Sequence, residues 1–303
     1  MRIASTQYHS TMNAALQTAT SRVQNILQKM ATGERYALPS ESPIANVRLS
    51  RLTREEAALD QYLDNITTLQ GAMSRNEALL MGMSQDMLAA RDLLVWAADG
   101  SNTTADVIAM AGSLEPLIES LFYNVNTRDA EGRYVFSGTA SDTAALSHDP
   151  LAPVGSRYSA TGNTTLQRVL VGNGITQPAN VTLTEMPAVM NQLEEIFMTL
   201  RTPGVSVNDP AVRAQLGAAL DGLDDAIEII SGKIAGLGGS QNILATLQSN
   251  HSNVSLSNQQ AALLIGQLDY GDAAVKMNGY ATAIEATQKA YAQVSRLSLF
   301  DVI

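Results

Sequence analysis

Apolar residues recur at seven-residue intervals through the stretch from residue 43 to about residue 99. The recurring positions are Leu52, Leu59, Ile66, Met73, Leu80, Met87 and Leu94. This spacing keeps an apolar stripe on one side of an α-helix and is typical of helices that pack lengthwise against other helices. Ser42 provides an N-cap, and Pro43 suits the first helical position. We therefore predict one helix from Pro43 to about Asp99, on the order of 80 Å long at 1.5 Å per residue.

Both ends of the chain carry a shorter stripe of the same kind, in which apolar residues step by four and three positions. The N-terminal stripe consists of Met12, Leu16, Ala19, Val23, Ile26 and Met30, and the C-terminal stripe of Met277, Tyr280, Ile284, Tyr291, Val294 and Leu297. Ionised side chains are sparse around them, and isolated helices of this kind are marginal in water. We expect both ends to be disordered in the monomer and to form an assembly interface by pairing with each other and with other copies.

Three further apolar stripes predict more helices, over residues 107–125, 188–200 and 211–263. An antiparallel return along the long helix is the most economical topology for them. Pro116 predicts a kink or a restart within the first of these helices. Asp209 followed by Pro210 is a second N-cap signal, Gly33 is expected to end the first helix, and Asp272 is expected to cap the last one.

The periodicity changes to an alternation of apolar and polar residues between the helical stripes. Short runs of this kind, separated by turns rich in glycine, asparagine and proline, predict strands at 132–138, 157–160, 166–171 and 181–184. The expected fold is mainly α, an elongated antiparallel helical or coiled-coil rod with a small β-rich insertion domain. We assign its parts as terminal helices at 1–40 and 268–303, the rod at 41–132 and 187–267, and the insertion at 133–186.

Composition narrows the classes of function. Charged residues make up only 16% of the chain, below the usual share of about 25%, which indicates that neighbours cover part of the surface. The net charge of −10 argues against nucleic-acid binding. The chain has no cysteine, which excludes disulfides, a thiolate nucleophile and a cysteine zinc site. No apolar run approaches the roughly 20 residues of a membrane span, and no cleaved signal peptide is apparent.

Candidate chemistry is equally sparse. His9, His148 and His251 are far apart in the sequence, so neither a metal site nor a catalytic histidine is indicated. Gly232 and Lys233 resemble the end of a phosphate-binding loop, but Ile227 stands where the first glycine of that motif is needed. No nucleophile, base and oxyanion donor can be grouped together. We predict no enzyme activity, no cofactor and no metal.

Four segments resemble motifs of a known family. They are Gly33-Glu34-Arg35 leading to Pro39-Ser40-Glu41-Ser42-Pro43, the run Tyr62-Leu63-Asp64-Asn65, the run Gly132-Arg133-Tyr134-Val135-Phe136-Ser137-Gly138, and Ser298-Leu299-Phe300-Asp301-Val302-Ile303. Together they resemble the flagellin-like axial proteins of bacterial flagella, most closely the branch that forms the junction between hook and filament. The resemblance covers both ends and the helical part, about three-quarters of the chain, and leaves residues 139–186 without a counterpart.

The resemblance implies a structural subunit of the extracellular flagellum, secreted unfolded by the flagellar type III route and polymerised at the distal tip. The implied partners are copies of the chain itself, the first hook-associated protein, flagellin and an export chaperone, with neither nucleic acid nor membrane among them. A filament-forming flagellin is the nearest alternative, although the ending at Phe300 and Asp301 favours the junction branch. A soluble coiled-coil adaptor is a more distant alternative, because it explains neither the charge-poor ends nor the β insertion.

Overall fold

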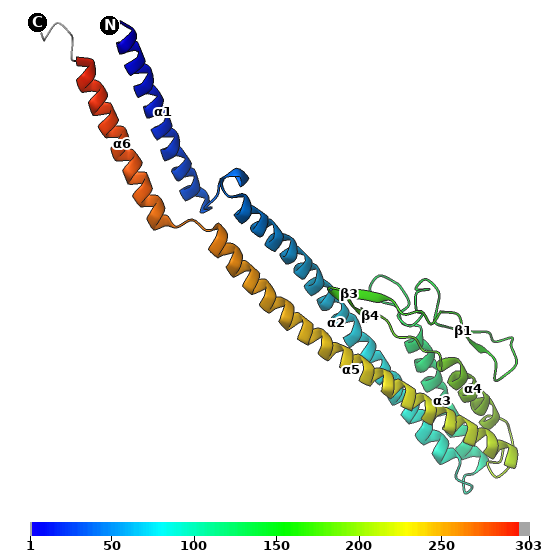
Figure 1. The fold of residues 1–303 in the computed structure, drawn as a ribbon. Helices are drawn as coiled ribbons and strands as arrows, with labels where there is room; N and C mark the ends of the chain where they lie inside the picture. Colours follow the sequence, from blue (N-terminus) through cyan, green and yellow to red (C-terminus); the bar gives the residue numbers. More distant parts are fainter. Residues whose placement is uncertain (1, 297–303) are drawn as a thin grey trace, which may run out of the picture. The chain divides into compact units, whose positions relative to one another are not determined.

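The computed structural model describes residues 2–296, with side chains over residues 7–293, and it is mainly helical (Figure 1). The helices are α1 (Arg2–Thr32), α2 (Pro43–Ala97), α3 (Thr104–Val125), α4 (Met186–Leu200), α5 (Pro210–Gly266) and α6 (Tyr270–Arg296), with a 3₁₀ turn at Pro39–Glu41. The strands are β1 (Leu146–His148), β2 (Tyr158–Ala160), β3 (Arg168–Gly172) and β4 (Ile175–Pro178). The predicted mainly helical class with a small β insertion is confirmed.

The chain divides into two compact units. Unit 1 comprises residues 1–59 and 252–303, and unit 2 comprises residues 60–251. The helices α2 and α5 each contribute one segment to both units. The domain division predicted from the sequence is placed at changes in the spacing of apolar residues, and it differs from these two units. The roles that it assigns to the terminal helices, the rod and the insertion stay predictions.

The predicted helix starts are confirmed at the two proline signals. The helix α2 begins at Pro43, and the amide of Ala45 donates to the Ser42 hydroxyl at 3.4 Å. The helix α5 begins at Pro210, where Asp209 accepts a hydrogen bond from the Ala211 amide at 2.8 Å. These side chains satisfy amides that have no partner inside the helix.

A restart at Pro116 and a cap at Asp272 are both wrong. Residues on both sides of Pro116 form one continuous helix, α3, because they keep a single buried face whose burial outweighs the roughly 3 kcal/mol cost of an internal proline. The alternative expectation, a kink at Pro116, stays a prediction. The last helix is capped by Asp269, whose Oδ1 accepts from the amides of Gly271 and Asp272. Asp272 itself lies in the first turn and pairs with Lys276 at 2.6 Å.

The core of unit 2 lies where four helices run side by side (Figure 1). The stripe on α2 is 0–1% exposed at Ile66, Met73, Leu80, Met87 and Leu94. It packs in one hydrophobic cluster with buried residues of α3, α4 and α5. Side-chain hydrogen bonds pair Glu77 with Gln241 and Arg91 with Asp224. Because the later residue of α2 meets the earlier residue of α5, the two helices are antiparallel in this unit.

The insertion contains two separate antiparallel pairs of strands. In the first pair Leu146 lies opposite Ala160 and His148 opposite Tyr158, and in the second Arg168 lies opposite Pro178. The strand predicted at 181–184 is wrong, since the fourth strand is β4.

The strand predicted at 132–138 is also wrong, because that segment forms turns around one isolated bridge between Arg128 and Tyr134. Positive φ angles at Gly132 and Gly138 turn the backbone, and the buried Ser137 hydroxyl donates to the Thr143 carbonyl at 2.6 Å.

A buried carboxylate fastens the first strand pair to α4. Glu194 is 6% exposed, accepts from the Arg157 guanidinium at 3.1 Å and lies 3.4 Å from His148 Nε2. Beside it, the Asn191 side chain bonds both the amide and the carbonyl of Tyr158, at 2.9 and 2.8 Å. Burial, together with the charge of Glu194, raises the pKa of Tyr158 to about 12. The phenol is therefore neutral at every physiological pH.

We predict that Leu80→Ala and Leu88→Ala, which make the same chemical change on α2, differ in their effect on stability. Leu80 is fully buried, whereas Leu88 is 44% exposed. The first change should lower the free energy of unfolding by about 2–5 kcal/mol and the second by less than about 1 kcal/mol. Urea denaturation followed by circular dichroism measures both. Equal losses would show that this seam does not form the core.

Candidate assembly interface

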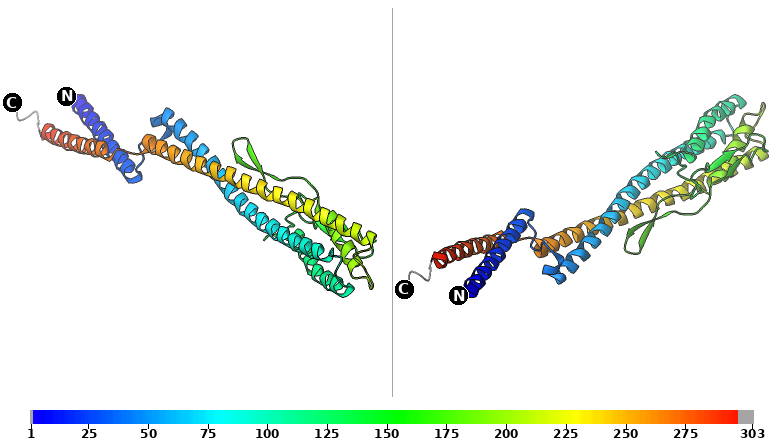
Figure 2. Two further views of the ribbon diagram at one scale, coloured as in Figure 1. Left: turned by 90° about the horizontal axis from the view of Figure 1, so that it is seen from below. Right: turned by 90° about the horizontal axis from the view of Figure 1, so that it is seen from above.

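The two terminal helices of unit 1 pack against each other; they lie side by side in Figure 1 and cross in the views of Figure 2. All six residues of the predicted N-terminal stripe lie on α1, and each is only half-buried. On α6, the residues Met277, Tyr280, Ile284 and Tyr291 are half-buried as well. Val294 belongs to α6, but its side chain lies outside the described residues, as does all of Leu297. Over residues 7–32 of α1 no side chain is buried, and over residues 270–293 of α6 only Ala273 is.

The structure brings the two stripes into contact through polar and aromatic groups. His9 Nδ1 lies 2.9 Å from the Tyr291 hydroxyl, and the Arg22 guanidinium lies 5.8 Å from the centre of the Tyr280 ring. Near the other end of α1, the Tyr270 hydroxyl donates to the Met30 carbonyl at 3.1 Å. The order of these contacts makes α1 and α6 antiparallel and fixes which turns face each other.

Sequence reasoning missed His9, Arg22 and Tyr270 as members of this contact. His9 lies three residues before Met12 and so continues the step of three and four along α1. That spacing is a signal that could have found it, although a search for apolar residues passes over a histidine. Tyr270 lies seven residues before Met277 and so continues the C-terminal stripe in the same way. Arg22 carries no comparable signal, because it acts through the reach of a long side chain from outside the stripe.

The segments that follow α1 and precede α6 are tied together by backbone hydrogen bonds. The Arg35 amide donates to the Gly266 carbonyl at 2.7 Å, and the Leu268 amide donates to the Gly33 carbonyl at 2.9 Å. Between them Glu34 and Gln267 form an antiparallel bridge. The pair of bonds holds the end of α1 against the start of α6, so the two stripes cannot slide past each other without breaking it.

An ion pair joins α1 to the loop that follows it. Lys29 Nζ lies 2.7 Å from Glu41 Oε2, and the same oxygen accepts from the Ala37 amide at 3.1 Å. The hydrogen bond from Lys29, assisted by that amide, holds the pKa of Glu41 below its usual value of 4.5. Glu41 is therefore ionised at neutral pH and keeps the loop folded back on α1.

Unit 1 also exposes large apolar side chains outside the two stripes. Ile44 and Val47 on α2, Leu264 on α5 and Val275 on α6 are each at least two-thirds exposed. A hollow of about 650 Å³, lined in part by Tyr36, Leu49 and Leu263, lies between the loop after α1 and the segments of α2 and α5 in this unit.

Among the described residues, no cluster of three or more His, Asp or Glu side chains could hold a metal ion. Within the same part of the chain, each helix falls short of the combined length and hydrophobicity that crossing a bilayer requires.

We predict that Gly33→Ala loosens the link between α1 and α6, while Gly279→Ala tightens α6. Gly33 has φ +74°, and an added Cβ would lie 3.3 Å from the Tyr270 hydroxyl, so local opening should become easier by about 1 kcal/mol. The amides of Arg35 and Leu268 should then exchange roughly fivefold faster. Gly279 has open space around it, and alanine there should stabilise the helix by roughly 0.5–1 kcal/mol. Hydrogen exchange measures both, and slower exchange in Gly33→Ala would contradict the prediction.

We also predict that acid opens the loop at Glu41. Because the folded pKa of Glu41 is depressed, its contribution to stability is present above the unfolded pKa and is lost in the acid window where pH falls through the folded pKa. Protection factors of amides in residues 35–41 should drop in that window. Glu41→Gln should remove the drop, whereas Glu34→Gln, at an exposed acid with no ion pair among the described residues, should keep it. If the drop in protection persists in the Glu41→Gln variant, another titrating group causes it.

Comparison with known proteins agrees with this arrangement. A family model described as the bacterial flagellin N-terminal helical region matches residues 3–141. The flagellar hook-associated protein 3 of Escherichia coli K12 is 26% identical over 293 residues, which cover 91% of each chain. A solved structure from Vibrio parahaemolyticus, described as a flagellar hook-associated protein, is 30% identical with a TM-score of 0.66 and covers 74% of this chain and 99% of its own.

A second solved structure shares the fold at lower identity. The flagellar junction protein FlgL of Legionella pneumophila is 14% identical, with a TM-score of 0.58 over 72% of this chain and all of its own. The half-buried terminal helices, the helical core and these relatives lead to one conclusion. The chain belongs to the family of flagellar hook-associated protein 3, the hook–filament junction protein FlgL, and it is a structural component of the bacterial flagellum.

Proposed function

We propose that this chain is a junction subunit between the hook-associated zone and the flagellin filament, and that it enters the flagellum through the stripes on α1 and α6. One observation carries the proposal. All ten stripe residues with described side chains remain half-buried although the two helices already pack together. The part of each stripe that stays exposed is then the surface that neighbouring subunits bury.

Energetics support a role for neighbours. Completing the burial of the stripe side chains is favourable, and it offsets part of the conformational entropy that is lost when α1 and α6 become ordered. Because contact between α1 and α6 alone buries so little, the pair needs further contacts to be stable. Folding of the ends would then be conditional on assembly.

The proposed role is structural rather than catalytic, and it sets requirements for export and partners. A chain whose ends stay unfolded can pass through the flagellar type III channel without a cleaved signal peptide. An export chaperone would cover the C-terminal stripe until the chain enters that channel. Copies of the chain would form the junction, with the first hook-associated protein on the proximal side and flagellin on the distal side. The low charge of the ends supports this proposal, since it suits burial against neighbours.

We predict that a charge placed in either stripe blocks assembly. Leu16→Asp and Ile284→Asp put a carboxylate at half-buried positions, whereas Thr18→Asp and Thr282→Asp put the same group at exposed positions of the same helices. Because burying an unpaired carboxylate costs several kcal/mol, incorporation of the stripe variants should fall at least about tenfold. Introduced into a strain that lacks the protein, they should leave hooks without filaments and release flagellin into the medium, while the controls restore swimming.

Two measurements make this test decisive. Thermal unfolding of the purified variants should match the unaltered protein for unit 2, so that a failure to assemble is not a failure to fold. Immunogold labelling should place the control variants in a narrow band next to the hook. Stripe variants that assemble as well as the controls would refute the interface, and label along the whole filament would instead assign the chain as a flagellin.

A further inference from the structure

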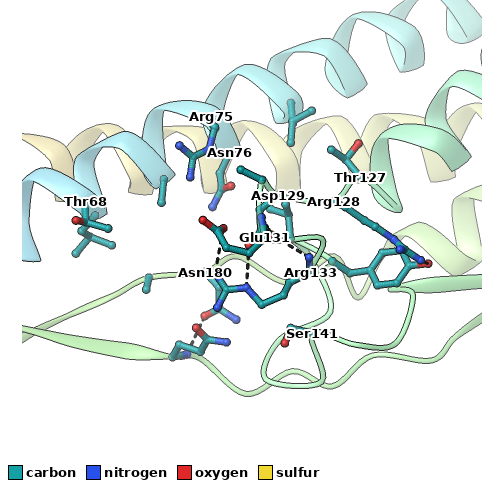
Figure 3. Close-up of a pocket in the computed structure, with 18 of the residues that line it drawn as sticks. Thr68, Arg75, Asn76, Thr127, Arg128, Asp129, Glu131, Arg133, Ser141 and Asn180 are labelled. Carbon is teal, nitrogen blue, oxygen red and sulfur yellow. Dashed lines mark hydrogen bonds and ion pairs between the residues drawn. The ribbon is translucent and has the colours of Figure 1, made fainter.

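A cavity of about 790 Å³ lies in unit 2, between α2 and the insertion (Figure 3). One wall is α2 from Asn65 to Leu79, and the opposite walls are the loop that follows α3 and the segments around β3 and β4. The Asn65 side chain donates to the Leu170 carbonyl at 2.8 Å, which fixes β3 against the helix. The volume of the cavity is within the range of roughly 300–1,000 Å³ that is typical of small-molecule sites.

Asn76 marks this cavity as more than a packing gap. The residue is only 5% exposed and lines the cavity, and Figure 3 shows its carboxamide projecting from α2 on the side that faces Glu131. Within the described residues its side chain makes no hydrogen bond. Its amide atoms are not among the fully buried side-chain atoms without a partner, so they stay accessible from the cavity. A carboxamide offers one acceptor and two donors. Its complement is another amide, such as a peptide group.

The charges around the cavity are unevenly paired. Arg133 donates to Asp129 at 3.1 Å and to Glu131 at 3.2 Å. Burial alone would raise the pKa of Asp129, but hydrogen bonds from the Arg133 backbone and guanidinium hold this pKa below its usual value. Arg128 lies 4.4 Å from the centre of the Tyr134 ring and donates to its hydroxyl. Arg75 has no ion pair or hydrogen bond among the described residues, and it lines the cavity next to Asn76.

The lining also includes polar residues such as Thr68 and Asn180, and its larger aliphatic members are Leu69, Leu79, Val135 and Val169. We propose that this cavity binds a peptide-borne carboxylate next to an aliphatic side chain. Arg75 would bind the carboxylate, Asn76 would pair with the adjoining peptide group, and the aliphatic residues would cover the side chain. Glu131, whose second oxygen has no partner among the described residues, would accept from a ligand N–H. This site is separate from the assembly interface and does not depend on it.

N-acetyl-L-leucine is the smallest probe that carries all three features. Its neutral matched control is N-acetyl-L-leucine amide, which lacks only the carboxylate. Binding to the full chain is followed by ligand-observed saturation-transfer NMR and by the shift of the Asn76 side-chain amide resonances. We expect the acid to bind roughly tenfold more tightly than the amide, because charge-assisted hydrogen bonds are the stronger ones.

The variants separate the two polar contacts. Arg75→Gln should weaken binding of the acid by roughly tenfold and leave binding of the amide unchanged. Asn76→Leu, which keeps the side chain's approximate size, should weaken both. Arg48→Gln, at an exposed arginine of unit 1 that makes no ion pair among the described residues, should change neither. Equal binding of acid and amide, an Arg75→Gln variant that binds like the unaltered protein, or no binding of either probe would each overturn the proposal.

A third probe identifies where the carboxylate comes from. N-acetyl-leucyl-glutamate with an amidated C-terminus carries its only carboxylate on the glutamate side chain. N-acetyl-L-leucine carries its only carboxylate at the chain end. Tighter binding of the first would assign the site to acidic segments within a chain, and tighter binding of the second would assign it to chain ends. Both results support the proposal, provided that Arg75→Gln weakens the tighter probe.

Discussion

The constraint behind this structure is that an apolar stripe on a helix is buried only when neighbours cover it on several sides. In unit 2 the stripe on α2 belongs to one cluster with three other helices, and its central residues are almost fully buried. In unit 1 the stripes on α1 and α6 have the same spacing, but each helix packs chiefly on the other and every stripe residue with a described side chain stays half-buried. Spacing alone therefore does not set burial, since the number of helices around a stripe decides it.

Register is the second requirement, because a stripe can serve as an interface only if its residues face a fixed direction. Heptad stripes of alanine, methionine and valine specify register weakly, since a shift by one repeat again pairs apolar residues with apolar residues. Polar contacts remove this ambiguity in unit 1. The backbone bonds of Gly33 and Arg35 hold one end of the helix pair, and the contact between His9 and Tyr291 holds it near the other. A shift of one repeat would leave each of these groups without its partner.

Much of the helical part could be predicted from the sequence, because heptad spacing and proline-based caps are local signals. The starts of α2 and α5 followed from Ser42-Pro43 and Asp209-Pro210. Residues 132–138 alternate as a strand does, yet they form turns, since a buried Ser137 and two glycines with positive φ decide the path. Asp269 and Asp272 are equally good caps in the sequence, and only the preceding link to Gly33 selects the first. The cavity could not be predicted, because its walls come from segments up to about a hundred residues apart.

The two small sheets in unit 2 are held by side chains rather than by a sheet core. Two-stranded pairs are marginally stable alone in water, and here each is fastened to a helix. Glu194 and Asn191 hold β1 and β2 on α4, while Asn65 and His251 bind carbonyls of β3. Such contacts fix a strand at a few points and leave space between them. The cavity beside Asn76 lies next to the contact made by Asn65, between α2 and the segments around β3 and β4. The proposed binding site therefore depends on the space that such sparse fastening leaves beside a small insertion.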